Sequence, residues 1–270
     1  MLALFRDFIK SIKNHNDEWE SLEELMKARA DFAVRHAFEG FGISYEDAIE
    51  LIRNAENLTD EQMVQRDILI AAVDNLVDFS VAEEYQLADE IAEYEELEEL
   101  DEDSEEYEEL LDMLFGICNK YNNRYAFVEN MDIEYAMIVA AYLASLQDDT
   151  ELMYMTMGDE RVRPWHLQYE GFTAPRSQFP SWLIPPIEHQ CRCYLLEHSR
   201  SSVMSSIHAR TIPKMPDWFD GTFKESVANG GRIFSDEHSY FQIDKKHSER
   251  LSAISKRIKA IYFGDGSNSN

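Results

Sequence analysis

The sequence predicts a mainly α-helical protein, with an acidic helical N-terminal domain followed by a smaller α+β domain of short strands and long loops. Three observations lead to this fold class. Apolar residues recur at helical spacing through the first half, the charge changes abruptly near residue 158, and every proline lies after that point. A hydrophobic content of 44% suffices for a packed core, so we do not expect a disordered chain.

The change in charge separates two parts of different composition. Residues 1–158 contain 40 acidic and 10 basic residues, whereas residues 159–270 contain 13 acidic and 15 basic ones. All 7 prolines belong to the second part. We therefore expect a boundary between residues 148 and 158, with an acidic α-helical domain at 1–150 and a second domain at 151–270.

Helices in the first half are predicted from periodic apolar residues and from their start signals. One such series is Leu22, Leu25, Met26, Ala30, Ala33, Val34 and Ala37, with acidic residues on the opposite face. Ser44 precedes Glu46 and Asp47, and Thr59 with Gln62 has the form of a capping box. We expect five or six helices on this basis, the last at residues 133–146.

The most acidic stretch, residues 83–109, also carries leucine, isoleucine and tyrosine at every third or fourth position. It is therefore expected to be a solvated helix face or a helical hairpin that turns near residues 101–104. Two alternatives stay open, a docking surface for a basic protein and a mimic of nucleic-acid charge. The net charge of −28 argues against direct nucleic-acid binding, because it repels phosphate.

Nothing in the sequence predicts a secretory leader or a membrane span. The apolar start at residues 1–5 is interrupted at once by Arg6 and Asp7, and residues 131–146 are too short and contain Asp132 and Glu134. We expect a protein made in the cytoplasm, with no membrane partner. Three cysteines are too few for a disulfide framework, so they are reduced thiols or metal ligands.

Two motif blocks stand in the second half. The first runs GDERVRPWHLQYEG from Gly158, and the second runs WLIPPIEHQCRCYL to Leu195. Their motif residues are Asp159, Arg161, Arg163, His166, Gly171, Trp182, Pro185, Pro186, Cys191, Arg192 and Cys193. Together they resemble the D-x-R-x-R-x-x-H-x-x-x-x-G and W-x-x-x-P-P-x-x-x-x-C-R-C pattern of the phage Mu F-like head-morphogenesis domain. The match is tight over 157–195 and loose over 110–200.

The resemblance implies a function in virion assembly. Proteins with this domain are minor capsid proteins of tailed phages, which act in head assembly or in DNA packaging and delivery. It implies a non-enzymatic protein near the portal, with portal or other capsid proteins as partners, located in the virion or procapsid after synthesis in the host cytoplasm. This chain has Glu188-His189-Gln190 where family members often have a Gly-Trp pair.

The two motif cysteines are candidate metal ligands. Cys191 and Cys193 are one residue apart, so in an extended segment their sulfurs share a face, and Arg192 points away to pair with an acid such as Asp159. Zinc needs two further ligands, for which His166 and His189 are the nearest candidates, with His198 and His208 behind them. The alternative is that both cysteines are small core residues and that His166 is structural.

The remaining motif residues allow a structural or a catalytic interpretation. Arg161 and Arg163 lie two apart and could pair with Asp159 or Glu170, and Pro185-Pro186 enforces an extended approach to the cysteines. Asp159, Arg161, Arg163 and His166 could instead bind phosphate and transfer protons, as in an RNase-like or metal-dependent effector. No companion motif accompanies them, so we predict no enzyme.

The C-terminal region is predicted to contain a basic helix. Leu251, Ile254, Ile258 and Ile261 are spaced for a helix over 248–262, and its basic residues are expected to dock on the acidic half. Residues 232–243 predict a short strand pair or an aromatic-anchored loop. The tail GDGSNSN is expected to be flexible from its composition.

Overall fold

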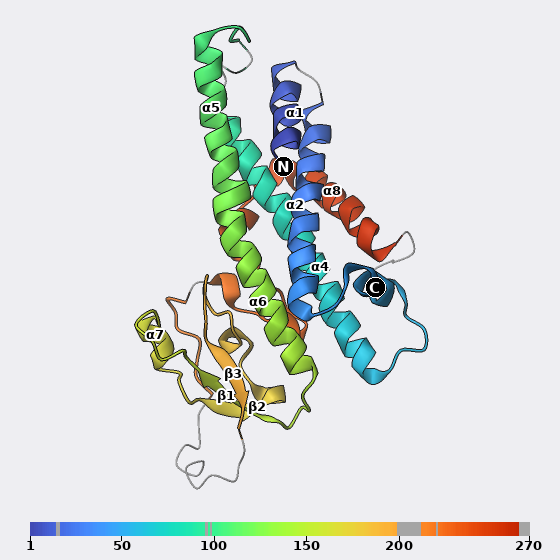
Figure 1. Cartoon of the computed structure of the whole chain (residues 1–270), viewed down its shortest axis with the longest axis vertical. Helices are drawn as coiled ribbons and strands as arrows, with labels where there is room; N and C mark the ends of the chain where they lie inside the picture. Colours follow the sequence, from blue (N-terminus) through green and yellow to red (C-terminus); the bar gives the residue numbers. More distant parts are fainter. Residues whose placement is uncertain (15–16, 95–96, 98, 199–211, 220, 265–270) are drawn as a thin grey trace. The chain divides into compact units, whose positions relative to one another are not determined.

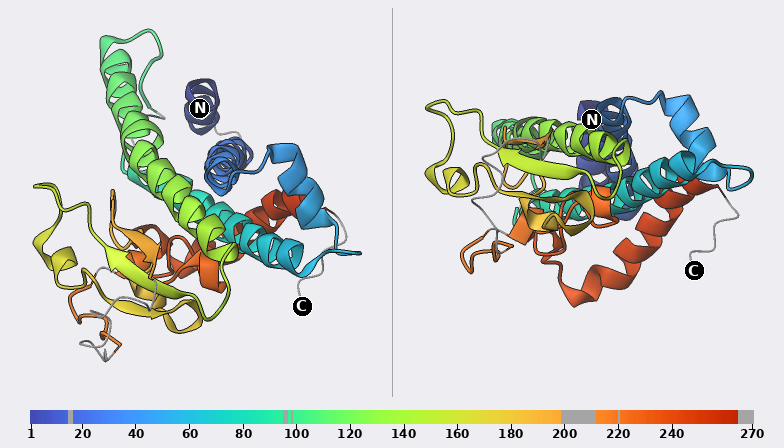
Figure 2. Two further views of the ribbon diagram at one scale, coloured as in Figure 1. Left: turned by 60° about the horizontal axis from the view of Figure 1, so that its bottom comes forward. Right: turned by 90° about the horizontal axis from the view of Figure 1, so that it is seen from below.

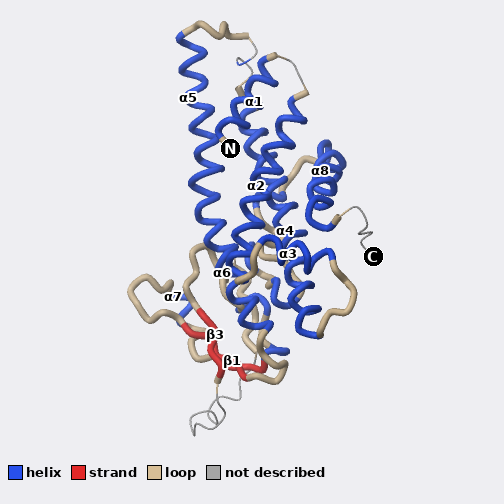
Figure 3. The backbone as a smooth tube through the Cα atoms, turned by 45° about the vertical axis from the view of Figure 1, so that its right-hand side comes forward, coloured by secondary structure: helices blue, strands red, loops and turns tan. Residues whose placement is uncertain are grey.

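The computed structural model describes residues 1–14, 17–94, 97, 99–198, 212–219 and 221–264 (Figure 1). It confirms the predicted fold class, because helices dominate and the strands form one small antiparallel sheet (Figure 3). The α-helices are α1 (Leu2–Lys13), α2 (Glu18–Phe41), α3 (Tyr45–Arg53), α4 (Asp60–Ile91), α5 (Glu105–Asn119), α6 (Ala126–Ala144), α7 (Pro164–Leu167) and α8 (Lys245–Phe263). No helix in these described stretches is both long and apolar enough to span a membrane.

The predicted helix starts are confirmed. The Ser44 side chain accepts a hydrogen bond from the backbone N–H of Asp47 at the start of α3. Before α4, Thr59 and Gln62 form the reciprocal capping box, since each side chain accepts from the other residue's backbone N–H. The apolar series that predicted α2, from Leu22 to Ala37, is buried throughout.

The acidic stretch forms two helices joined by a loop. Helix α4 ends at Ile91, and α5 begins at Glu105 after its N-cap Ser104, whose side chain accepts from the N–H of Tyr107. This confirms the helical-hairpin interpretation. The turn that precedes α5 lies at residues 101–104, as predicted. A π-helical segment, Lys120–Tyr125, then joins α5 to α6, and the three form a continuous helical run (Figure 2).

Contacts divide the chain into two compact units. Unit 1 comprises Met1–Arg35, Val73–Asn130 and Ser239–Asn270, and unit 2 comprises His36–Ala72 and Met131–His238. Helices α2, α4 and α6 therefore contribute residues to both units. The division of the chain at about residue 150, which rests on composition, stays a prediction.

In unit 1 the basic helix α8 packs against the acidic N-terminal helices, as predicted. Its residues Leu251, Ile254 and Ile258 are buried, and Arg250, Arg257 and Lys259 pair with acidic residues. Arg257 binds Glu23 of α2, and the Lys259 ammonium lies 2.6 Å from Asp74 and 2.9 Å from Asp78 of α4. Apolar burial and charge complementarity thus act together on this helix.

Unit 1 also contains a buried charged cluster that the sequence did not predict, consisting of Arg29, Glu83, Glu84 and Glu129. The Arg29 guanidinium, 2% exposed, donates to Glu83 at 2.6 Å and to Glu129 at 2.8 Å. Tyr240 donates to the second oxygen of Glu129 at 3.0 Å. Burial raises the pKa of the Glu84 carboxyl to about 7 and raises that of Glu83 well above its ordinary value, despite the opposing effect of Arg29.

The sheet belongs to unit 2 and has the strand order β2-β1-β3. Strand β1 (Glu151–Met155) pairs antiparallel with β2 (Thr173–Pro175) and with β3 (Tyr194–Glu197). Loops and short 3-10 turns make up much of the remaining described part of this unit. The predicted strand pair at 232–243 does not form; Phe234 is fully buried and anchors a loop there, which was the alternative.

Candidate metal centre

The first motif block leaves strand β1 and returns to it. Gly171 has a φ of +75°, in the left-handed region that favours glycine, and its N–H donates to the Tyr154 carbonyl at 2.8 Å. The Tyr154 N–H donates in turn to the carbonyl of Phe172 at 2.9 Å. The motif glycine therefore lets the loop turn back onto the strand, which encloses α7 and its His166 within the loop.

The second block forms a buried approach to the two cysteines. Trp182 packs edge-on against Tyr169 and Phe219, with ring centroids 5.2 and 5.6 Å away. Pro185 and Pro186 are buried, and the peptide bond between them is cis. Two anchors follow, since the N–H of Gln190 donates to Asp132 at 2.7 Å and that of Cys191 donates to the Glu188 carbonyl at 3.0 Å.

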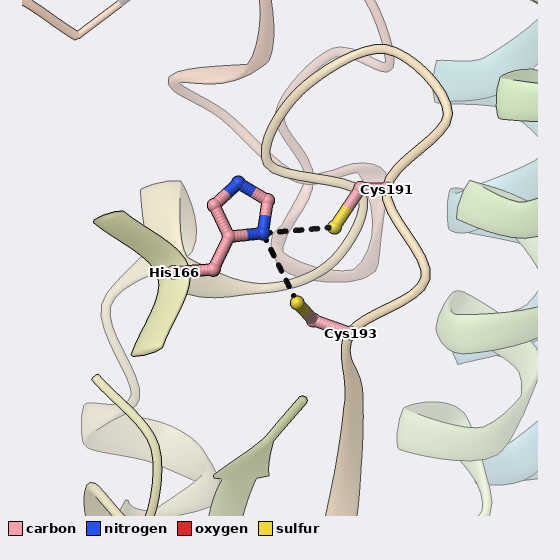
Figure 4. A group of neighbouring side chains, drawn as sticks. All are labelled: His166, Cys191 and Cys193. Atoms are coloured by element: carbon pink, nitrogen blue, oxygen red, sulfur yellow. Dashed lines mark hydrogen bonds between the residues drawn. The ribbon is translucent and has the colours of Figure 1, made fainter. Parts of the chain in front are cut away.

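The two blocks bring together His166, Cys191 and Cys193, as Figure 4 shows. The Nδ1 atom of His166 lies 3.1 Å from the sulfur of Cys193 and 4.0 Å from that of Cys191. All three donor atoms lie within 4.8 Å of one another, and the side chains are at most 5% exposed. This confirms that both cysteines face His166, as their spacing predicted.

Glu188 orients the histidine from its other side. The Nε2 atom of His166 lies 3.1 Å from a Glu188 carboxylate oxygen, which also accepts from the indole N–H of Trp165 at 2.9 Å. Arg163 holds the second oxygen at 2.7 Å. In the neutral imidazole whose Nε2–H donates to this carboxylate, Nδ1 carries the lone pair that faces the sulfurs. A carboxylate behind a histidine in this way is the usual outer shell of a protein metal site.

The cysteine pair is set up to hold a negative charge. The pKa of Cys193 is lowered, because the Cys191 thiol and the Tyr154 hydroxyl favour its thiolate and Arg163 and Arg192 act in the same direction. The pKa of Cys191 is raised, because it donates to Cys193 and is buried. Of the two thiols, Cys193 therefore loses its proton more readily, and a metal cation would displace the protons of both.

The spacing of the donors fits a metal ion. In a tetrahedral zinc site of ordinary bond lengths, a nitrogen and a sulfur ligand are about 3.6 Å apart. The two nitrogen–sulfur distances observed, 3.1 and 4.0 Å, lie on either side of this value. The cluster can therefore hold a metal with small movements of the side chains.

His189 lies apart from this cluster. Its Nδ1 atom is 2.8 Å from the carboxylate of Asp132, and its ring packs edge-on against Phe223. His198, at the end of β3, donates its backbone N–H to Glu151, and His208 lies outside the described residues. The structure thus joins three of the four predicted ligands.

The remaining charged motif residues bind one another. Arg192 forms a forked pair with Asp159, at 2.7 and 2.8 Å, as predicted. The predicted pairing of Arg161 or Arg163 with Asp159 or Glu170 is wrong for their side chains. Arg163 binds Glu188 and the His189 carbonyl, whereas Glu170 accepts from Thr156, because the motif loop brings the second block closer.

Sequence reasoning missed the residues that support the cluster. Glu188 was noted only as a departure from the family pattern, and Trp165, Tyr154 and Asp132 were not considered as site residues. A carboxylate three residues before a cysteine pair could have indicated Glu188. No local signal indicates Asp132, which reaches the site from α6.

Comparison with family models, with curated proteins and with solved structures finds no match to this chain. The likeness to the Mu F-like domain therefore rests on the two motif blocks alone.

Proposed function

We propose that the protein is a non-enzymatic minor head protein of a tailed phage, and that zinc bound by His166, Cys191 and Cys193 stabilises its motif region. Its partners would be the portal or other capsid proteins. It would act in head assembly or in DNA packaging and delivery, within the virion or procapsid.

The observation that carries this proposal is that the motif residues are engaged with each other. Asp159 is held by Arg192, Arg163 by Glu188, and His166 stands between Glu188 and the cysteines. A catalytic set needs groups that are aimed at a substrate, whereas these contacts close residues 159–193 on themselves. That arrangement supports an architectural role.

The donor chemistry favours zinc among the common metals. Two thiolates and one imidazole form a soft set that suits zinc, whereas magnesium and calcium prefer oxygen ligands. His166, Cys191 and Cys193 would hold the ion, and Glu188 would keep the imidazole in the binding tautomer. Bound zinc would supply cross-links between segments 25 and 27 residues apart in the sequence.

Metal analysis of reduced, tag-free protein tests the zinc part of the proposal. We expect close to one equivalent of zinc, with affinity that falls as pH drops because the ligands bind deprotonated. A Cys191→Ser, Cys193→Ser double variant should lose the metal, whereas Cys118→Ser should keep it, because Cys118 belongs to the helix α5. Protein that binds no zinc and whose thermal unfolding is unchanged by chelator would show that the cysteines are core residues.

Mass spectrometry of purified heads tests the role in assembly. The protein should be found at low copy number in virions or procapsids, together with the portal. Its absence from both particles would contradict the proposal.

If a basic partner docks on the acidic helices, its binding should weaken between low and physiological salt, because exposed charges are screened over about 8–10 Å there.

Two further assays address the alternatives. An RNase-like effector would cleave RNA in a reaction lost on His166→Ala, usually by about a hundredfold or more. A charge mimic would displace duplex DNA from a packaging protein. We expect neither result.

A further inference from the structure

A small cavity adjoins the His166/Cys191/Cys193 cluster and bears on which molecule supplies the fourth ligand of the proposed metal site. It has a volume of about 20 Å³, and it is lined by Met157, Arg161, Val162, Arg163, His166, Gln190, Arg192 and Cys193. A cavity of roughly 10–15 Å³ or more accommodates one water molecule. Two of the three metal ligands therefore share a wall with a space for a single small molecule.

The described residues supply three ligands and no fourth. No other histidine, cysteine or carboxylate among them joins the group that lies within 4.8 Å. Glu188 and His189 are engaged elsewhere, because Glu188 binds the far side of His166 and His189 binds Asp132. A zinc ion held by three protein ligands keeps a fourth position for an outside ligand.

The charges around the cavity favour an anion in that position. The two thiolates would neutralise a divalent metal, while Arg163 is balanced by Glu188 and Arg192 by Asp159. Arg161 lines the same cavity, and among the described residues its charge acts on Asp159, the carboxylate that Arg192 already binds at 2.7 Å. One positive charge is thus left over beside the open position.

We propose that the fourth ligand of the metal is a small exogenous anion, in exchange with water, which enters through this cavity and is bound by Arg161. The inference rests on the zinc proposal and adds to it a site that responds to anions. No carboxylate lines the cavity, so the described residues supply no general base there. The exchangeable ligand is consequently compatible with a non-enzymatic protein.

Cobalt(II) in place of zinc, with azide as the probe, tests the proposal on the full chain. The visible spectrum of cobalt reports its ligands directly, so azide should change the spectrum in a saturable titration. Arg161→Ala should bind cobalt but lose about tenfold in azide affinity, the effect expected for one charge-assisted hydrogen bond. Arg161→Lys should retain part of the affinity, and Lys214→Ala, an exposed cation of unit 2 outside the cavity, should match the wild type.

The outcomes distinguish a failure of this inference from a failure of the zinc proposal on which it rests. Cobalt that binds with a spectrum unaffected by azide means a closed site, which overturns the inference and leaves the metal site standing. An azide response that is equal in Arg161→Ala and wild type overturns the assignment to the arginine-lined cavity. Failure to bind either cobalt or zinc overturns both proposals.

Discussion

The buried charged cluster of unit 1 and the His166/Cys191/Cys193 cluster of unit 2 are built on opposite principles. In unit 1, helices hold Arg29 among Glu83, Glu84 and Glu129, so one cation is outnumbered by carboxyl groups. In unit 2, the short helix α7 holds His166 and the segment before β3 holds Cys191 and Cys193, whose donor atoms lie within 4.8 Å of one another. The first cluster needs protons to balance its charge, whereas the second offers donor atoms that could hold a metal cation. The contrast indicates that burial alone does not identify a candidate functional site. The chemistry of the buried groups, and the counter-charge that they require, distinguish the two clusters.

The largest effect is expected from removing the one cation of the unit 1 cluster. Arg29→Met should lower the free energy of unfolding by about 3–5 kcal/mol, because it leaves buried carboxylates without a partner. Urea denaturation measures this loss, which should be greater at high pH, where those carboxyls ionise. Arg35→Ala, on an exposed residue of the same helix paired with Asp31, serves as the control and should cost less than about 1 kcal/mol. Equal effects for the two variants would show that the Arg29 cluster contributes little.

The next effect tests the protonation of that cluster. Burial raises the pKa of Glu84 from 4.5 in the unfolded chain to about 7, so its contribution to stability is full below pH 4.5 and is lost as pH rises through 7. Glu84→Gln should therefore be more stable than wild type at pH 8.5, by about 2–3 kcal/mol at most. The difference should vanish below pH 4.5. Urea denaturation at both values measures it, and a pH-independent difference would contradict the raised pKa.

A smaller effect is expected at the carboxylate that orients His166. Glu188→Gln should weaken zinc binding about 10–100-fold, because the imidazole loses the partner that fixes its tautomer. Competition with a chromogenic chelator measures the affinity. Glu160→Gln changes an exposed acid of the same loop and should leave the affinity unchanged. Loss of zinc affinity to the same extent in both variants would attribute the effect to overall charge.

The smallest effect is expected at the exposed pair of Asp159 and Arg192. Asp159→Asn should lower the Tm slightly, and less than Glu188→Gln does in the zinc-bound protein. The wild-type advantage should disappear in about 1 M salt, because the pair is exposed and screened. Differential scanning calorimetry at low and high salt provides the test. A loss of Tm that persists at high salt would indicate a packing role for this pair.

Much of the helical fold could be predicted because helix signals are local. The spacing of Leu22 to Ala37 and the caps at Ser44 and Thr59 need only neighbouring residues, and all are confirmed. The basic helix α8 was also predicted, from its spacing and from the opposite charge of its partner. The strand pair at 232–243 was a wrong alternative, because imperfect alternation cannot distinguish a strand from a loop anchored by Phe234.

The residues of the two buried clusters show the same difference between local signals, which can be predicted, and long-range contacts, which cannot. Cys191, Cys193 and His166 were predicted to meet because the two motif blocks carry them. Glu83 and Glu84 lie in a run of acids that reads as a solvated face, and only the position of Arg29 in another helix explains their burial. Likewise, Glu188 approaches His166, whereas His189 does not. The hydrogen bond from the Gln190 N–H to Asp132 of α6 holds this segment in place. These contacts depend on which distant segments the fold brings together, so spacing within one segment does not predict them.

The membership of α8 in unit 1 affects the order in which the chain can fold during translation. Unit 1 combines the first 35 residues with helix Lys245–Phe263, whereas unit 2 is complete by His238. A nascent chain therefore carries Trp19 and Glu23 of α2 for more than 200 residues before their contacts in α8, His247 and Arg257, leave the ribosome. At about 5–20 residues per second this delay lasts at least about ten seconds. During that interval a chaperone or an assembly partner has access to apolar surface that the finished protein buries.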